Sequence, residues 1–123
     1  MGKIRLISWN VNGIRAVEKK GFLQWFANEK PDVLCLQETK ASEDQLSEQI
    51  KNIDGYHSYW CLGEKKGYSG TALYCREKPI NVCYGFDDRK DFDNEGRIIF
   101  AEFKNYFIYN IYFPNGQKDE IRL

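Results

Sequence analysis

The sequence has little of several features that would mark other classes of protein. It contains one histidine, one methionine and three prolines among 123 residues, and its 18 basic and 18 acidic side chains leave no net charge. Balanced charge argues against a protein that coats nucleic acid non-specifically, although a local basic rim remains compatible with it. No apolar stretch approaches membrane-spanning length, and charged residues recur from the start. We therefore expect a cytosolic protein without a signal peptide or a membrane partner.

The four cysteines, Cys35, Cys61, Cys75 and Cys83, follow no zinc-binding spacing. Each lies in an apolar stretch typical of a strand. We interpret them as small buried hydrophobic residues in a reducing compartment, with two disulfides as the alternative. The glycine-rich stretch 63–70 is not a P-loop, because it lacks the Gly-Lys-Ser/Thr ending. It could meet a phosphate backbone or serve only as a solvated connection.

An apolar run that ends in charged residues organises the sequence. The stretch 33–36 does not alternate with polar residues, which predicts a strand buried on both faces. The carboxylate of Glu38 and the ammonium of Lys40 follow it closely. A rigid buried strand with a polar end is a common way to position an active site.

A predicted strand over 3–10 and a helical pattern over 14–26 precede this run. A strand–helix–strand unit makes its two strands parallel, so their carboxyl ends meet at one rim of the sheet. Asn10 and Glu38 are then expected at the same rim, where an amide oxygen and a carboxylate suit a hard cation such as Mg²⁺. The alternative is that both residues only serve turns after their strands.

The rest of the chain favours a short helix and further strands. Ser42 and Gln45 resemble a capping box, which predicts a helix to about residue 52. His57 lies within a strand pattern, so we interpret it as a packing residue rather than a catalyst. Tyr112 ends the last strand and could reach the rim or cap the core with its hydroxyl in water. The predicted strands are 56–61, 71–75, 80–85, 97–103 and 106–113, the last two forming a hairpin.

Five stretches together resemble the N-terminal half of the exonuclease III family of abasic-site DNA endonucleases, within the wider endonuclease/exonuclease/phosphatase fold. They are 7–16, 31–40, 66–74, 93–98 and 110–117. The asparagine of the first strand and the Gln-Glu-Thr sequence are shared across the wider fold, including lipid and inositol phosphodiesterases. The Gly-Tyr-Ser-Gly-Thr, Asn-Glu-Gly-Arg and Tyr-Phe-Pro-Asn-Gly stretches point to the DNA repair branch.

The resemblance implies roles for the matched residues. Asn10 and Glu38 resemble metal ligands, for Mg²⁺ or alternatively Mn²⁺. Tyr112 matches the family's active-site tyrosine, close to the scissile phosphate, and Asn115 resembles a residue that hydrogen-bonds the phosphate or the abasic sugar. The residues implied to support the site or to contact DNA are Asn12, Arg15, Lys40 and Tyr68.

The fold implied by the resemblance is α/β: the N-terminal half of a four-layer sandwich of the DNase I-like type, with a mixed sheet and flanking helices over residues 1–123. The activity implied for the intact enzyme is Mg²⁺-dependent hydrolysis 5′ to abasic sites in double-stranded DNA, leaving a 3′-hydroxyl, with 3′–5′ exonuclease activity. One alternative is another metal-dependent phosphodiesterase of this fold, acting on RNA, a nucleotide or an inositol phosphate. The other is a non-catalytic fragment that binds DNA or a protein.

The family's second half has no counterpart in this sequence. That half normally brings a Gly-Asp-x-Asn stretch and a late Asp-His pair, which orient the attacking water and complete the metal site. We therefore expect this chain to supply mostly one of the fold's two sheets and to be catalytically silent alone. A lone sheet would expose a large apolar face, so we expect a complementary C-terminal half or self-association to cover it.

Overall fold

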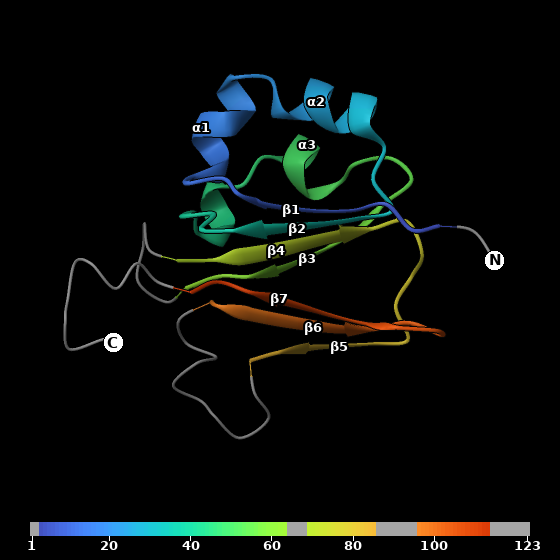
Figure 1. The fold of residues 1–123 in the computed structure, drawn as a ribbon. Helices are drawn as coiled ribbons and strands as arrows, with labels where there is room; N and C mark the ends of the chain where they lie inside the picture. Colours follow the sequence, from blue (N-terminus) through green and yellow to red (C-terminus); the bar gives the residue numbers. More distant parts are fainter. Residues whose placement is uncertain (1–2, 64–68, 86–95, 114–123) are drawn as a thin grey trace.

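The computed structural model describes residues 3–63, 69–85 and 96–113 (Figure 1). The strands are β1 (Leu6–Asn10), β2 (Val33–Gln37), β3 (His57–Cys61), β4 (Thr71–Cys75), β5 (Asn81–Tyr84), β6 (Ile98–Glu102) and β7 (Phe107–Ile111). The helices are α1 (Ile14–Lys19), α2 (Phe22–Glu29) and α3 (Glu48–Lys51), with a 3₁₀ turn over Glu43–Gln45. Among these described segments, no helix has the length and apolar character needed to cross a membrane.

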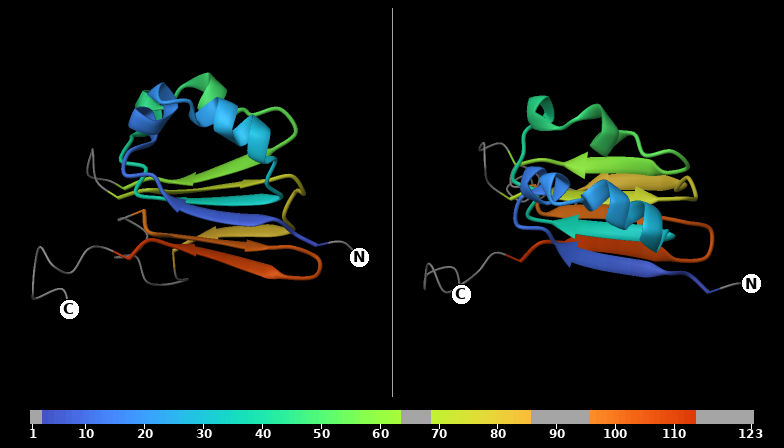
Figure 2. Two further views of the ribbon diagram at one scale, coloured as in Figure 1. Left: turned by 45° about the horizontal axis from the view of Figure 1, so that its top comes forward. Right: turned by 90° about the horizontal axis from the view of Figure 1, so that it is seen from above.

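The strands form two sheets that stack face to face, with the helices covering the outer face of the larger one (Figures 1 and 2). The larger sheet has the order β1-β2-β4-β3, and the smaller has the order β5-β6-β7. Among the strands that the structure describes, β1 and β2 pair in parallel and the other neighbours are antiparallel. The expectation that the chain supplies mostly one sheet is wrong, because β5, β6 and β7 form a sheet of their own after the break at Pro79.

Two apolar layers hold these elements together. Between the helices and the larger sheet, Phe22 and Phe26 of α2 belong to the same core cluster as Leu34 and Leu36 of β2. Val33 and Cys35, on the other face of β2, belong to the cluster between the two sheets, with Leu73, Ile99, Ala101 and Phe103. The prediction that β2 is buried on both faces is confirmed, since the residues 33–36 are all buried.

The predicted helix over 14–26 is two helices, because the chain turns at Gly21 with a left-handed φ of 103°. The capping box of Ser42 and Gln45 is present, but it begins a 3₁₀ turn rather than one helix to residue 52. The α-helix starts separately, where the hydroxyl of Ser47 accepts a hydrogen bond from the N–H of Ile50. The local capping prediction is therefore confirmed, while the predicted helix length is wrong.

Cysteine labelling should report on this packing. All four cysteines are free; Cys35, Cys61 and Cys75 are buried, and Cys83 is half-buried. Burial raises the pKa of the Cys35 and Cys75 thiols to about 12. Because the thiolate is the reactive form, we expect iodoacetamide at about pH 8 to modify Cys83 fastest in the folded chain, and all four residues at similar rates in urea. Mass spectrometry would measure this, and faster labelling of Cys35 or Cys75 than of Cys83 would contradict the packing.

Candidate functional site

The carboxyl ends of β1, β2 and β7 lie on the same side of the molecule (Figure 1). In the parallel pair, Asn10 at the end of β1 lies opposite Gln37 at the end of β2. Glu38 directly follows Gln37, so it lies beside the end of β1. Asn110 of β7 bonds the carbonyl of the residue before Gln37, which brings Tyr112, two residues later, to the same side. We call the end of the sandwich that carries Asn10, Glu38 and Tyr112 the rim. The predicted shared rim for Asn10 and Glu38 is confirmed.

A chain of polar contacts links five of the residues at the rim. The ammonium of Lys40 lies 3.1 Å from a carboxylate oxygen of Glu38 and donates to Oδ1 of Asn12 at 2.7 Å. The backbone N–H of Asn12 donates to Oδ1 of Asn10 at 3.0 Å, and the guanidinium of Arg15 donates to the carbonyl of Lys40 at 3.5 Å. The structure therefore brings together five of the eight residues predicted for the site. It also places a cation directly beside the Glu38 carboxylate.

The backbone around the rim adopts conformations that side chains rarely tolerate. Asn12, Glu38, Lys40 and Ser69 have φ values of 49°, 58°, 54° and 56°, in the left-handed region that favours glycine. Backbone hydrogen bonds hold these residues in place: Gly13 N–H donates to the Glu38 carbonyl and Lys40 N–H to the Ser69 carbonyl, both at 2.8 Å. Such conformations cost on the order of 1 kcal/mol each and cluster at functional sites. Their concentration here favours a site over simple turns.

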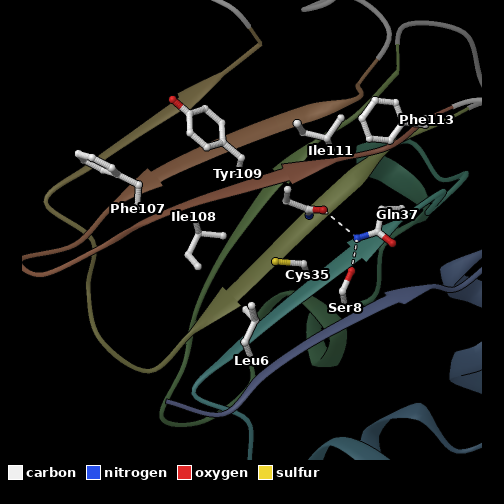
Figure 3. A pocket seen from close by; sticks show the side chains of 10 residues that line it. Leu6, Ser8, Cys35, Gln37, Phe107, Ile108, Tyr109, Ile111 and Phe113 are labelled. Atoms are coloured by element: carbon white, nitrogen blue, oxygen red, sulfur yellow. Dashed lines mark hydrogen bonds between the residues drawn. The ribbon is translucent and has the colours of Figure 1, made fainter. Parts of the chain in front are cut away.

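A bridge of amide side chains joins the two sheets directly beneath the rim. Asn110 is 2% exposed, and its Nδ2 donates to the carbonyls of Leu36 and Ala72 at 3.1 and 2.7 Å. Its Oδ1 accepts a hydrogen bond of 2.8 Å from Nε2 of Gln37, which also donates to the hydroxyl of Ser8 at 3.0 Å (Figure 3). The bridge therefore fixes β7 against β2 just below the rim.

Sequence reasoning did not find the bridge, although one signal for it was present. Alternation along the last strand places Asn110 on the same face as Ile108, and Ile108 packs in the core between the sheets. A polar side chain on a buried apolar face needs hydrogen-bond partners. Neither the partners nor their strands could be named from that pattern, because Gln37 lies 73 residues away.

Gly70 offers a direct test of how tightly the rim is packed. A Cβ on Gly70 would lie 2.2 Å from Oγ1 of Thr39, and its φ is +98°; Thr39 is fully buried. We expect Gly70→Ala to lower the free energy of unfolding in urea by about 2 kcal/mol or more. Gly55→Ala is the matched control, since Gly55 has a φ of +86° and open space around it. Equal losses in the two variants would contradict a clash at the rim.

The remaining predicted residues have different outcomes. Tyr112 is half-buried, and its backbone N–H donates to the Arg97 carbonyl at 2.8 Å, which holds it beside β6. Tyr68 and Asn115 lie outside the described residues. His57 is exposed and pairs with Cys75 at the end of the sheet away from the rim. The interpretation of His57 as a packing residue is therefore wrong, because its side chain points to solvent at the start of β3.

The donors at the rim fit part of a magnesium site. Glu38 offers a carboxylate and Asn10 an amide oxygen, and Mg²⁺ prefers such hard oxygen ligands while keeping several waters. Within the segments that the structure describes, no three His, Cys, Asp or Glu residues gather closely enough to hold a metal ion by themselves. The metal roles of Asn10 and Glu38 stay predictions, and the donor set calls for further ligands from water, substrate or other polypeptide.

Comparison with known proteins places this geometry in context. The sequence profile of the Endonuclease/Exonuclease/phosphatase family matches residues 7–120. The DNA repair nuclease APEX1 of Danio rerio is 45% identical over 122 residues, which cover 98% of this chain and 39% of that protein. The exodeoxyribonuclease of Bacillus subtilis is 45% identical over 116 residues, covering 94% of this chain and 44% of that protein.

A solved structure agrees with these relatives. The AP endonuclease from Archaeoglobus fulgidus superposes with a TM-score of 0.76 at 32% identity, over 93% of this chain and 42% of that one. This likeness confirms the predicted fold class, a part of the larger α/β sandwich. The chain spans about two-fifths of the length of these similar proteins.

Proposed function

Because the chain belongs to the endonuclease/exonuclease/phosphatase family, we propose that it forms the N-terminal part of a metal-dependent DNA repair phosphodiesterase. The observation that carries this proposal is the rim, where Asn10 and Glu38 end adjacent parallel strands and Tyr112 follows a third. The names of the DNA repair nuclease and the exodeoxyribonuclease support a DNA substrate. The proposed reaction is hydrolysis 5′ to an abasic site in duplex DNA, leaving a 3′-hydroxyl, accompanied by 3′–5′ exonuclease activity.

The proposed roles follow from what phosphodiester hydrolysis requires. Charge on the phosphate must be neutralised, and the attacking water and the leaving oxygen must be positioned. Glu38 and Asn10 hold Mg²⁺, or alternatively Mn²⁺, and the bound ion supplies charge neutralisation at the phosphate oxygens. Tyr112 donates its hydroxyl to a non-bridging oxygen. Asn115 donates from its amide to the same phosphate or to the abasic sugar.

The cationic part of the rim is suited to the DNA backbone. Lys40 has a half-exposed side chain, with 38% of it accessible, and Arg15 is exposed at the start of α1. We propose that Lys40 exchanges its contact with the Glu38 carboxylate for a DNA phosphate when substrate binds, while Asn12 keeps its position through its backbone. Tyr68 completes the DNA-contacting set in this proposal. Phosphate contacts of this kind position the duplex but read no sequence.

Full turnover is proposed to require a complementary C-terminal half. Among the described residues, Glu38 is the carboxylate that follows a strand at the rim, and no group of three His, Cys, Asp or Glu residues is present there to hold a metal ion. The residues that the family resemblance implies for orienting the water have no counterpart among residues 1–123. A partner that brings these groups to the rim would complete both the metal site and the nucleophile's environment.

A nicking assay tests the proposal. The substrate is a duplex with one abasic site, incubated with this chain alone, or with the chain and the C-terminal half of the Bacillus subtilis exodeoxyribonuclease. We expect an incision 5′ to the site only with both halves and Mg²⁺, no incision in EDTA, and a product end that a polymerase can extend. Turnover by the chain alone would contradict the proposed dependence on a second half. A stable complex that leaves the duplex intact would contradict the proposed function.

The same assay separates the two rival functions. Preferential cleavage of RNA, a nucleotide or an inositol phosphate by the combined halves would indicate another phosphodiesterase of this fold. DNA binding that needs no divalent ion and does not respond to Glu38→Ala would indicate a non-catalytic module. The proposal instead expects preference for the abasic duplex and sensitivity to that substitution.

A further inference from the structure

The ammonium of Lys40 bridges the two chain segments that leave the parallel strands at the rim. It donates to Oδ1 of Asn12 at 2.7 Å and lies 3.1 Å from Oε2 of Glu38. Asn12 belongs to the segment after β1, and Glu38 and Lys40 belong to the segment after β2. One positive charge therefore contacts an amide oxygen and a carboxylate oxygen together. These are the kinds of oxygen that a hard divalent cation also uses.

The backbone holds Lys40 beside Glu38 independently of the charges. Both residues have left-handed φ values, 54° for Lys40 and 58° for Glu38, and the N–H of Lys40 donates to the Ser69 carbonyl at 2.8 Å. The side chain of Glu38 is 21% exposed and that of Lys40 is 38% exposed. The pair is thus partly withdrawn from water, where charges act on each other more strongly than on an open surface.

The oxygens expected to bind a metal ion already contact groups of this chain. Oε2 of Glu38 contacts the Lys40 ammonium, and Oδ1 of Asn10 accepts a hydrogen bond of 3.0 Å from the N–H of Asn12. A divalent cation on Glu38 would meet the ammonium at the same carboxylate, and two positive charges so close repel each other. The ammonium sits on a flexible four-carbon stem, so it can move away when the cation binds.

We propose that Lys40 is a tethered cation that competes with the divalent metal for Glu38, so that metal binding and DNA binding strengthen each other. The proposal rests on the proposed function, because it takes the metal role of Glu38 and the DNA role of Lys40 from there. The metal frees Lys40 for a DNA phosphate, and the phosphate keeps Lys40 away from Glu38. Coupling of this kind is reciprocal, because each ligand changes the affinity for the other by the same factor.

A competing role and a supporting role for Lys40 have opposite consequences for metal affinity. If the ammonium only ordered Glu38 and Asn12 for the metal, its removal would weaken metal binding. If it competes with the metal, its removal strengthens metal binding, because Glu38 then faces the cation with its full charge. Lys40→Met separates the two roles, since methionine keeps an unbranched flexible stem without the charge.

Mn²⁺ titration followed by electron paramagnetic resonance tests the competition without turnover. It is carried out without DNA, in salt of about 0.15 M to screen distant charges. We expect Lys40→Met to bind Mn²⁺ at least about tenfold more tightly than the unsubstituted chain. Lys51→Met is the matched control, because it removes an ammonium that pairs with Glu43 and Glu48 on the helical side. The control should bind Mn²⁺ like the unsubstituted chain.

Two results of this titration would overturn the proposal. Unchanged or weaker Mn²⁺ binding by Lys40→Met would assign Lys40 a supporting role or none. An equal gain in Lys40→Met and Lys51→Met would assign the effect to net charge alone. Thermal melts would verify that the variants fold, and Lys40→Gln, which also lacks the ammonium, repeats the test with a polar side chain.

The coupling to DNA is measured by repeating the titration with a duplex that carries one abasic site. In the unsubstituted chain, we expect saturating duplex to tighten Mn²⁺ binding. The factor of tightening should be at least about fivefold smaller in Lys40→Met, because no ammonium then remains for the DNA to draw away from Glu38. Equal factors in the two proteins would overturn the coupling through Lys40.

The outcome for Lys40 is separable from the outcome for the proposed function. Weaker Mn²⁺ binding by Glu38→Gln with no change in Lys40→Met would leave the metal role of Glu38 standing and overturn the competition alone. Unchanged Mn²⁺ binding in both variants would contradict the metal role and the competition together. Tighter Mn²⁺ binding by Lys40→Met, with no incision of abasic DNA by the combined halves, would contradict the proposed function and leave the competition standing.

Discussion

Replacing Glu38 with glutamine is expected to slow the Mg²⁺-dependent nicking of abasic DNA by about a hundredfold or more when the chain is combined with its complementary half. Glu38 is the carboxylate that lies at the rim, directly after β2 and beside Asn10. Glutamine keeps the shape of the side chain but removes the negative charge that would hold the cation. Single-turnover nicking rates over a range of Mg²⁺ concentrations would measure the loss.

The substitution should affect chemistry far more than folding. The contact between Glu38 and Lys40 joins two partly exposed side chains, and such ion pairs contribute at most about 1 kcal/mol to stability. Glu43→Gln is the matched control: it removes the same charge from an exposed carboxylate that pairs with Lys51 on the helical side. A nicking rate for Glu38→Gln equal to that of the control would contradict a metal role for Glu38.

Metal binding offers a readout that does not depend on turnover. Mn²⁺ titration followed by electron paramagnetic resonance can be applied to the chain by itself. We expect Glu38→Gln to weaken Mn²⁺ binding at least about tenfold, because Asn10 would remain as a neutral ligand without a carboxylate beside it. The Glu43→Gln control should bind Mn²⁺ like the unsubstituted chain. Unchanged binding in both variants would place the cation elsewhere.

Replacing Asn110 with alanine is expected to lower the free energy of unfolding by about 3 kcal/mol. The side chain is buried and makes three hydrogen bonds, two as donor to the carbonyls of Leu36 and Ala72 and one as acceptor from Gln37. Its removal takes a partner from buried polar groups of both β2 and β4 and leaves a small void between the sheets. Urea unfolding monitored by tryptophan fluorescence would measure the change.

An exposed asparagine provides the comparison for this variant. Asn52 donates to Glu48 at 2.9 Å on the surface, where water can replace the lost contact. Asn52→Ala should therefore cost less than about 1 kcal/mol. If the two alanine variants lose stability equally, the amide bridge does not hold the sheets together. If Asn110→Ala also slows nicking by the combined halves under conditions where the variant is fully folded, the bridge positions the rim as well as stabilising the fold.

The rim was the part of the candidate site that could be predicted most directly. Its prediction needed only the apolar run of β2, a helical pattern before it and the rule that such a unit makes parallel strands. The strained backbone at Glu38 and Lys40 could not be predicted, because left-handed φ values at these residues depend on hydrogen bonds to Gly13 and Ser69 from other segments. The position of Tyr112 likewise depended on how the second sheet packs.

The sequence by itself determined the periodicity of the strands, the parallel pair that brings Asn10 and Glu38 together, and the resemblance to the family. These features depend on residues that are close along the chain or on short motifs. Only the tertiary structure decided that β5, β6 and β7 form a second sheet and that Asn110 joins it to the first. Each of these depends on contacts between distant segments, such as the 73-residue separation of Gln37 and Asn110, which no local pattern specifies.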